Sequence, residues 1–373
     1  MPEMPFKLAG MFLSAGLLAA GLAGPAYPAD VSTTVQSGSA PAKAAVTTPA
    51  GRSGVASNEA DIVFPPPPDK PRIRYLYSLA RYQDMGFPER GFFGKILDFF
   101  TGKKIPEGWA LVRPYGVCAV GDRVYVADTE GSAVVVFNRV KKTITRFGGK
   151  LAGRLVAPIG IASDGRETVF VTDSNQKLVM AYDLEGNFLF QCSPTGDFDR
   201  PTGLAWDAAR NRLLVVDSGR KMVFAYGLDG IKKAEYPVEG DMAGGLVNPV
   251  NIALGPGGEM FITDPIICGV SVFSPEGKFL RKWGECGDMA GYFARPRGVA
   301  LDSEGNVYVA DALFHAVQIF DPAGKLLLFF GADGSEPGAF HLPAGIFIDP
   351  QDRVYVVDSG NNRVQVFQYI KTR

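Results

Sequence analysis

The two histidines of the 373-residue chain are the side chains best suited to bind a metal ion. A catalytic zinc site normally has three protein ligands and one open position. His315 and His341 would therefore need a carboxylate or a cysteine as a third ligand. We keep both as candidate metal ligands, favour the interpretation that they are ordinary loop residues, and predict no cofactor.

Other motifs for catalysis are missing from the sequence. There is no Gly-x-Ser-x-Gly elbow, no phosphate-binding Walker loop and no carboxylate pair at an interpretable spacing. The four cysteines include no C-x-x-C pair, the spacing used for thioredoxin-type redox chemistry and haem attachment. The sequence leaves enzymatic activity open and favours a protein without it.

Six aspartates each end a short apolar run, at intervals of 44 to 47 residues. They are Asp128, Asp173, Asp217, Asp264, Asp311 and Asp358. A ring of acids could bind cations, but an identical place in every repeat favours a structural role. A carboxylate at a strand end can accept hydrogen bonds from backbone N–H groups of the following turn. We predict that all six are such caps.

Four arginines and a tyrosine lie beside a proline that also recurs six times. They are Arg113, Tyr115, Arg200, Arg295 and Arg297. Guanidinium groups bind carboxylates and phosphates through paired hydrogen bonds. This set would suit an anionic small ligand or an acidic segment of a protein partner. The equally favoured alternative pairs the arginines with loop acids such as Asp197, Asp199 and Asp288.

The recurring prolines and aspartates mark the elements that position these residues. Each repeat contains four short runs of alternating residues between Gly-, Asn- or Asp-containing turns, which is typical of antiparallel hairpins. A period of about 40 to 50 residues indicates a β-propeller. We predict an all-β, six-bladed propeller of four-stranded antiparallel blades over residues 72–373. A glycine two residues after five of the prolines predicts crowding of the inner strands, and Asn251 replaces it once.

The repeat resembles the NHL repeat. The resemblance is carried by the proline-x-glycine start of each unit, the valine-tyrosine-valine-alanine-aspartate run ending at Asp311, and residues 362–367. NHL-type propellers include secreted and surface binding modules, protein-interaction and RNA-binding domains and a few lyases. The resemblance therefore implies an architecture before an activity. Amidating-lyase relatives use a histidine-rich zinc site, which two histidines alone cannot reproduce.

The ring can be closed by the N-terminal part of the repeat region. The sixth unit ends after its third strand, while residues 72–78 alternate like an outer strand. We predict that this strand completes the sixth blade and leaves no open edge. The next connection, residues 79–112, then lies with all other outer-to-inner connections on one face, which we call the top face.

Residues 79–112 carry apolar side chains at helical spacing, which predicts a short amphipathic helix on the top face. They include Phe92, Phe93, Ile96 and Leu97. We favour a lid packed on the propeller. The alternative is a docking element for a protein or a membrane surface.

Two of the cysteines and both histidines are also expected on the top face. Cys268 and Cys286 belong to one blade, and a disulfide between them is as favoured as two free thiols if the compartment is oxidising. His315 and His341 are expected near each other. Cys118 falls in an inner-strand pattern and is expected as a buried apolar residue.

The N-terminal residues predict the compartment. Residues 1–29 combine a lysine, an apolar run and small residues at two cleavage positions, which is typical of a signal peptide. The run is too short and too rich in Gly and Ala for a stable transmembrane anchor, although retention as an anchor is the minor alternative. Residues 30–71, rich in Pro, Ala, Ser and Thr, are predicted as a disordered linker. A periplasmic or extracellular location follows.

The charge balance limits the partners. With 38 Lys and Arg against 39 Asp and Glu, the chain has a formal charge of -1, which disfavours nucleic acid. We predict a secreted, monomeric scaffold whose top face binds a protein partner or an anionic small ligand. The alternative is a metal-dependent lyase or hydrolase with its site in the central channel.

Overall fold

A computed structural model of the chain describes residues 61–81, 84, 110–150, 152–193, 196–237 and 245–371. These residues form strands and one 3-10 helix, η2 (Ser359–Asn361). No helix in the described ranges is long and apolar enough to span a membrane. The predicted signal peptide and the side chains of Phe92, Phe93, Ile96 and Leu97 lie outside these ranges.

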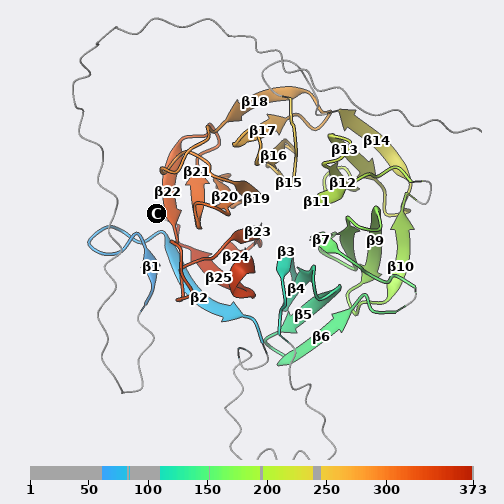
Figure 1. The fold of residues 1–373 in the computed structure, drawn as a ribbon, viewed down its shortest axis with the longest axis horizontal. Coiled ribbons are helices and arrows are strands. Elements are labelled where there is room, and N and C mark those ends of the chain that lie inside the picture. Colours follow the sequence, from blue (N-terminus) through green and yellow to red (C-terminus); the bar gives the residue numbers. More distant parts are fainter. Residues whose placement is uncertain are drawn as a thin grey trace, which may run out of the picture. The chain divides into compact units, whose positions relative to one another are not determined.

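The strands form six antiparallel sheets arranged as a ring, which confirms the predicted six-bladed propeller (Figure 1). The first blade contains β3 (Pro114–Val120), β4 (Arg123–Asp128), β5 (Ala133–Asn138) and β6 (Thr143–Phe147). The second contains β7 (Pro158–Ser163), β8 (Thr168–Asp173), β9 (Leu178–Asp183) and β10 (Phe188–Cys192). The third contains β11 (Pro201–Asp207), β12 (Arg212–Asp217), β13 (Met222–Tyr226) and β14 (Lys232–Pro237).

The remaining blades repeat this order from the innermost to the outermost strand. The fourth contains β15 (Asn251–Leu254), β16 (Met260–Asp264), β17 (Gly269–Phe273) and β18 (Phe279–Trp283). The fifth contains β19 (Pro296–Leu301), β20 (Val307–Asp311), β21 (Ala316–Phe320) and β22 (Leu326–Phe330). The sixth contains β23 (Pro343–Ile348), β24 (Arg353–Asp358), β25 (Arg363–Tyr369), β2 (Ile73–Leu79) and β1 (Val63–Phe64).

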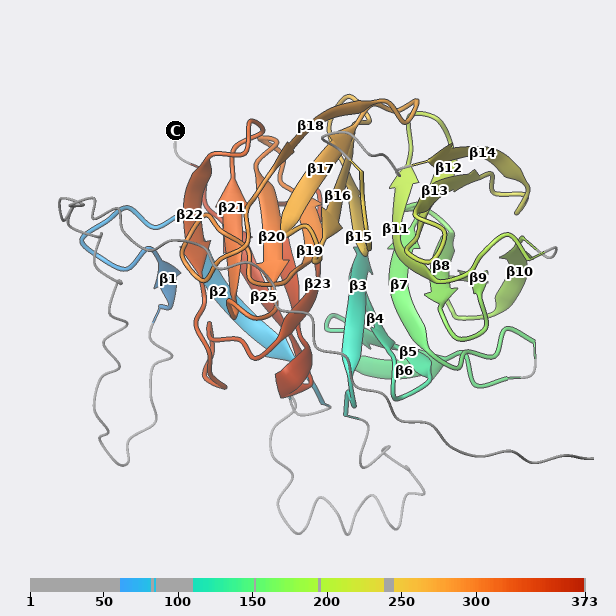
Figure 2. The same ribbon diagram turned by 45° about the horizontal axis from the view of Figure 1, so that its top comes forward.

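The sixth blade is completed by the N-terminal strand, as predicted. β2 pairs antiparallel with β25, in a register that places Ile73 opposite Tyr369 and Leu79 opposite Val364. The two strands come from opposite ends of the repeat region and lie side by side in Figures 1 and 2. Pairing the first strand with the last leaves the ring without an open seam between blades.

The predicted linker ends earlier than residue 71. Val63 and Phe64 form β1 and pair with Arg74 and Ile73. The Phe64 ring lies 5.6 Å from the ring of Phe330 and packs against the apolar cluster between the fifth and sixth blades. A short apolar stretch within a polar, proline-rich segment is thus held by the propeller itself.

The core lies between neighbouring blades. Six clusters of buried apolar residues each combine side chains of two adjacent sheets. At the axis, a Cβ atom on Gly116, Gly160 or Gly298 would collide with a backbone carbonyl of the next blade's inner strand. The inner strands therefore crowd as the glycines predicted.

Candidate functional site

All six recurring aspartates are buried, and five of them accept backbone N–H groups of the turn that follows, as predicted. The sixth, Asp358, departs from the prediction, because the side chains of Asn361, Arg363 and Gln365 donate to it instead. Asp217 accepts the backbone N–H groups of Asp199 at 2.7 Å and Arg200 at 3.0 Å, just before β11. It also accepts those of Gly219 and Arg220 at 2.9 Å, in the turn after β12. The bonds to the following turn were predicted, whereas those to the entry of the inner strand were not. Each aspartate thereby fixes the rim of its own blade.

These caps position the arginines of the top face. The backbone N–H groups of Arg113 and Arg295 donate to Asp128 at 2.8 Å and to Asp311 at 2.7 Å. Arg200 is held by Asp217 in the same way. All three side chains are exposed. The sequence placed them on one rim because they precede equivalent prolines.

Two of the rim arginines have partners on the protein. The Arg113 guanidinium pairs with Glu130 at 2.7 Å. Arg200 donates to the Ser218 hydroxyl at 2.7 Å and to the Asn248 amide oxygen at 2.6 Å. Both side chains are thus engaged at the rim.

Two of the acids considered as arginine partners, Asp197 and Asp199, bind lysines instead. Asp199 pairs with Lys177 at 2.7 Å, and Asp197 pairs with Lys232 at 3.3 Å. The hydrogen bond from Lys177 holds the pKa of the Asp199 carboxyl below its ordinary value. These acids are therefore not the partners of the rim arginines.

Arg295 and Arg297 have no carboxylate partner among the described residues. The Arg297 guanidinium lies over the Tyr115 ring, 5.3 Å from its centroid, a cation–π contact. Arg297 begins the fifth blade and Tyr115 the first, so the contact crosses the sixth blade, where the equivalent residue is Ala344. The contact therefore brings a cation of the fifth blade beside the aromatic ring of the first.

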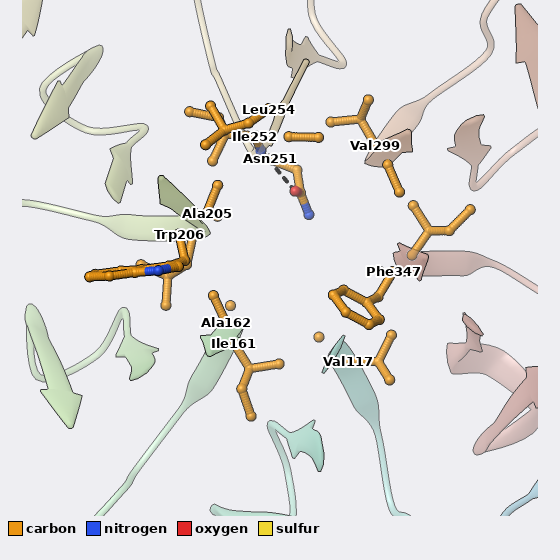
Figure 3. A pocket seen from close by; sticks show the side chains of 18 of the residues that line it. Val117, Ile161, Ala162, Ala205, Trp206, Asn251, Ile252, Leu254, Val299 and Phe347 are labelled. Atoms are coloured by element: carbon orange, nitrogen blue, oxygen red, sulfur yellow. Dashed lines mark hydrogen bonds between the residues drawn. The ribbon is translucent and has the colours of Figure 1, made fainter. Parts of the chain in front are cut away.

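The central channel contains a cavity of about 410 Å³ that is lined by the inner strands. Figure 3 shows Trp206, Phe347, Leu254 and other apolar side chains around it, with Asn251 pointing inward. Its lining holds one carboxylate, Asp164, which accepts the N–H groups of the turn that follows it. The lining residues include no histidine or cysteine. Among the described residues, the lining therefore offers no histidine or cysteine ligand for a zinc ion.

The two histidines meet on the top face, outside the channel. Nδ1 of His341 lies 2.9 Å from Oδ1 of Asp333, and Nδ1 of His315 lies 3.3 Å from the same oxygen. The imidazole rings are 5.4 Å apart and nearly parallel. The hydrogen bond from His341 lowers the pKa of the Asp333 carboxyl. Sequence reasoning placed both histidines on this face but missed Asp333.

The cysteines divide into one bonded pair and two buried thiols. Cys268 and Cys286 form a disulfide with a Cα–Cα distance of 5.0 Å. Cys118 and Cys192 are free and buried. Burial raises the pKa of the Cys192 thiol to about 12, which makes it a poor nucleophile at neutral pH.

The ends of the 79–112 insertion meet at the rim. Arg81 and Ala110 form an isolated antiparallel bridge, and the Leu111 N–H donates to the Ala80 carbonyl at 3.1 Å. The insertion therefore leaves and re-enters the top face at one point, close to the start of the first inner strand.

Five four-stranded sheets and one five-stranded sheet around a central channel define a β-propeller. The NHL repeat model matches residues 293–320 and 340–367, which cover the first three strands of the fifth and sixth blades. This match and the six-bladed architecture together support an NHL-repeat propeller. No curated protein matches the chain in sequence.

Several solved structures share the fold. A protein of unknown function from Bacteroides thetaiotaomicron has a TM-score of 0.57 at 16% identity, over 69% of this chain and 70% of its own. A virginiamycin B lyase from Staphylococcus aureus, solved with quinupristin, has a TM-score of 0.52 at 14% identity, over 69% and 95%. The hydrazine synthase of Kuenenia stuttgartiensis has a TM-score of 0.51 at 13% identity, over 72% and 98%. At these identities the likeness concerns the fold alone.

Proposed function

We propose that the protein is a binding scaffold whose top face takes a carboxylate or phosphate group at Arg295 and Arg297. The observation that carries this proposal is that both guanidinium groups lack a carboxylate partner among the described residues, although other charged side chains of this face are paired. Unpaired guanidiniums held on a rigid rim are suited to an anion because little ordering is left to be done on binding.

The channel cavity suggests the chemistry of the part of the ligand that does not contact the arginines. Tyr115 contacts Arg297 on one side and lines the apolar cavity on the other. An anionic group at the rim could therefore carry an apolar part into the channel. A small amphipathic acid or an acidic segment of a protein partner has this chemistry. The metal-enzyme alternative receives no support from the channel lining, which lacks histidine and cysteine.

A location outside the cytoplasm forms part of the proposal. The disulfide between Cys268 and Cys286 and the signal-like composition of residues 1–29 both support an oxidising compartment. A monomeric propeller on a proline-rich linker would then present its top face to partners of the cell envelope.

Native mass spectrometry of the protein, purified gently from its own cell envelope, tests the proposal. The wild type is compared with Arg295→Glu/Arg297→Glu and with Arg166→Glu/Lys141→Glu, which makes the same charge change in exposed turns of the opposite face. We expect the wild type and the control to retain an anionic ligand or partner.

The rim variant should lose this ligand. Two hydrogen bonds to charged groups contribute roughly 1.5–3 kcal/mol each, so we expect binding to weaken about 100-fold or more. A wild type that carries nothing would contradict the proposal. Equal retention by the two double variants would contradict it as well.

A further inference from the structure

Each blade has one residue with positive φ immediately before its third strand. The six are Ser132, Lys177, Lys221, Cys268, His315 and Asn362, with φ between 49° and 59°. The left-handed backbone is a shared feature of the repeat, while the side chain differs from blade to blade. This position is therefore one where the repeat tolerates different chemistry.

In several blades this position links to the connection that enters the next blade. The Ser132 hydroxyl donates to the carbonyl of Val156 at 2.8 Å. Lys177 pairs with Asp199 at 2.7 Å. The position thus serves as an anchor between a blade and its successor.

The fourth and fifth blades make this link at matching residues. Cys268 and His315 are 47 residues apart, and so are Cys286 and Asp333. Cys268 bonds to Cys286, and Nδ1 of His315 lies 3.3 Å from Oδ1 of Asp333. The histidine–aspartate pair therefore takes the place that the disulfide takes one blade earlier.

The backbones of the two connections follow the same path. Cys286 forms an isolated parallel bridge with Phe293, and Asp333 forms one with Phe340. The N–H of Phe293 donates to Glu285 at 2.9 Å, and that of Phe340 donates to Ala332 at 2.8 Å. The matching positions are thus equivalent in space as well as in sequence.

The fifth blade adds a third group, His341, from the same connection. One nitrogen of each histidine and one Asp333 oxygen all lie within 4.8 Å of one another. The Leu342 N–H donates to Nδ1 of His315 at 3.3 Å, a long hydrogen bond that a metal ion bound at this nitrogen would replace. Oδ1 of Asp333 lies within 3.3 Å of Nδ1 of both histidines, so the three candidate ligand atoms converge on one point.

We propose that His315, Asp333 and His341 bind a zinc ion on the top face, at the position that the Cys268–Cys286 disulfide occupies in the preceding blade. Two imidazoles and a carboxylate are ordinary zinc ligands, and they leave a fourth position for water. Donor atoms held tetrahedrally at about 2.0–2.1 Å from zinc stand about 3.3 Å apart, so the observed spacing needs only small side-chain rotations.

The ion would act as a staple. The His341 and Asp333 side chains are 47% and 64% exposed, so zinc can enter from solvent and keep a water ligand. None of the three residues lines the channel cavity. The site shares no residue with the proposed ligand site at Arg295 and Arg297, so the two proposals are tested by different variants.

Zinc binding is measured by isothermal titration calorimetry on the full chain after chelation and dialysis. The variants are His341→Gln and Asp333→Asn, which keep the side-chain outlines. Asp199→Asn is the matched control, because it removes an exposed carboxylate that is paired on the same face. We expect one zinc per wild-type chain and at least about 10-fold weaker binding in both site variants, since even outer-shell changes cost that much. The control should bind as the wild type does.

Thermal melts in the absence of zinc report whether the variants are folded. Zinc should raise the melting temperature of the wild type and of the control more than that of the site variants. Equal zinc affinity in the wild type and His341→Gln would show an adventitious ion only and overturn the proposal. No binding by the wild type would reduce the cluster to a histidine–aspartate ion pair and overturn it too.

A separate experiment tests whether His315 and Asp333 are structurally equivalent to Cys268 and Cys286. His315→Cys/Asp333→Cys should form a second disulfide on air oxidation, detected by mass spectrometry after alkylation. Free thiols at both positions would show that the two connections differ, and this would remove the structural basis of the staple.

Discussion

Asp217 offers the sharpest test of how the blades hold their rims. We choose the substitution Asp217→Asn, which preserves shape while removing the charge and one acceptor. Oδ1 accepts the N–H groups of Arg200, Gly219 and Arg220, and Oδ2 accepts that of Asp199. An amide that keeps its oxygen at the Oδ1 position turns its NH2 toward the Asp199 N–H. Donor then faces donor in a site where the side chain is fully buried.

The expected cost follows from these bonds. A hydrogen bond to a charged group contributes about 1.5–3 kcal/mol, and an unsatisfied buried donor costs about 1–3 kcal/mol. One bond is lost outright and three lose their charge. Since such contributions are not additive, we expect Asp217→Asn to lower the free energy of unfolding by about 2–4 kcal/mol.

Urea unfolding followed by tryptophan fluorescence measures the shift in midpoint and slope. Asp199→Asn is the control, because this exposed carboxylate pairs with Lys177 and should cost at most about 1 kcal/mol. A shift for Asp217→Asn no larger than that of the control would refute the cap interpretation. The recurring acids would then need another role.

Two further predictions concern the cross-links of the ring. Cys268→Ser/Cys286→Ser should lower the free energy of unfolding by about 3 kcal/mol. This is the loss expected for a loop near 15 residues, and the bonded cysteines are 18 residues apart. An unchanged midpoint of guanidinium unfolding would contradict this prediction. Burial raises the pKa of Asp352, but the hydrogen bonds from Lys371 and Ser303 outweigh it and hold the pKa below its ordinary value. This contribution is present above the unfolded pKa of about 3.9 and is lost as the pH falls through the lower folded pKa. Melting temperatures between about pH 2 and 7 should therefore fall less steeply with acid for Asp352→Asn than for the wild type, and parallel curves would exclude this role.

The fold was predictable because residues in each repeat mark where its strands begin and end. The proline before each inner strand and the aspartate after each second strand recur with a period that only a few architectures use. The closing strand was predictable as well, since the sixth unit lacks an outer strand. β1 was not, because Val63 and Phe64 become a strand only through contact with Ile73 and Phe330. No local pattern in a proline-rich segment encodes that contact.

The sequence was sufficient to predict which face of the propeller carries the candidate sites. It was not sufficient to predict which side chains pair with each other there. Equivalent positions in the repeat placed the arginines on one rim, but whether Arg113 binds Glu130 or a more distant acid depends on loop geometry within a few ångströms. Asp333 carried a usable signal, the 47-residue offset from Cys286. It was missed because the repeat was aligned on its prolines and strand ends rather than on its connections.

The pairing of β2 with β25 also determines how the ring responds to mechanical load. Ile73 and Tyr369 face each other at one end of the β2–β25 ladder, and the Ile370 N–H donates to Arg72 at 2.7 Å. The chain enters β2 and leaves β25 at this same end of the ladder, so tension applied there separates the two strands from one end. The hydrogen bonds then break one after another instead of sharing the force. Once β1 has separated from β2, a propeller under tension therefore opens first in the sixth blade, between β2 and β25.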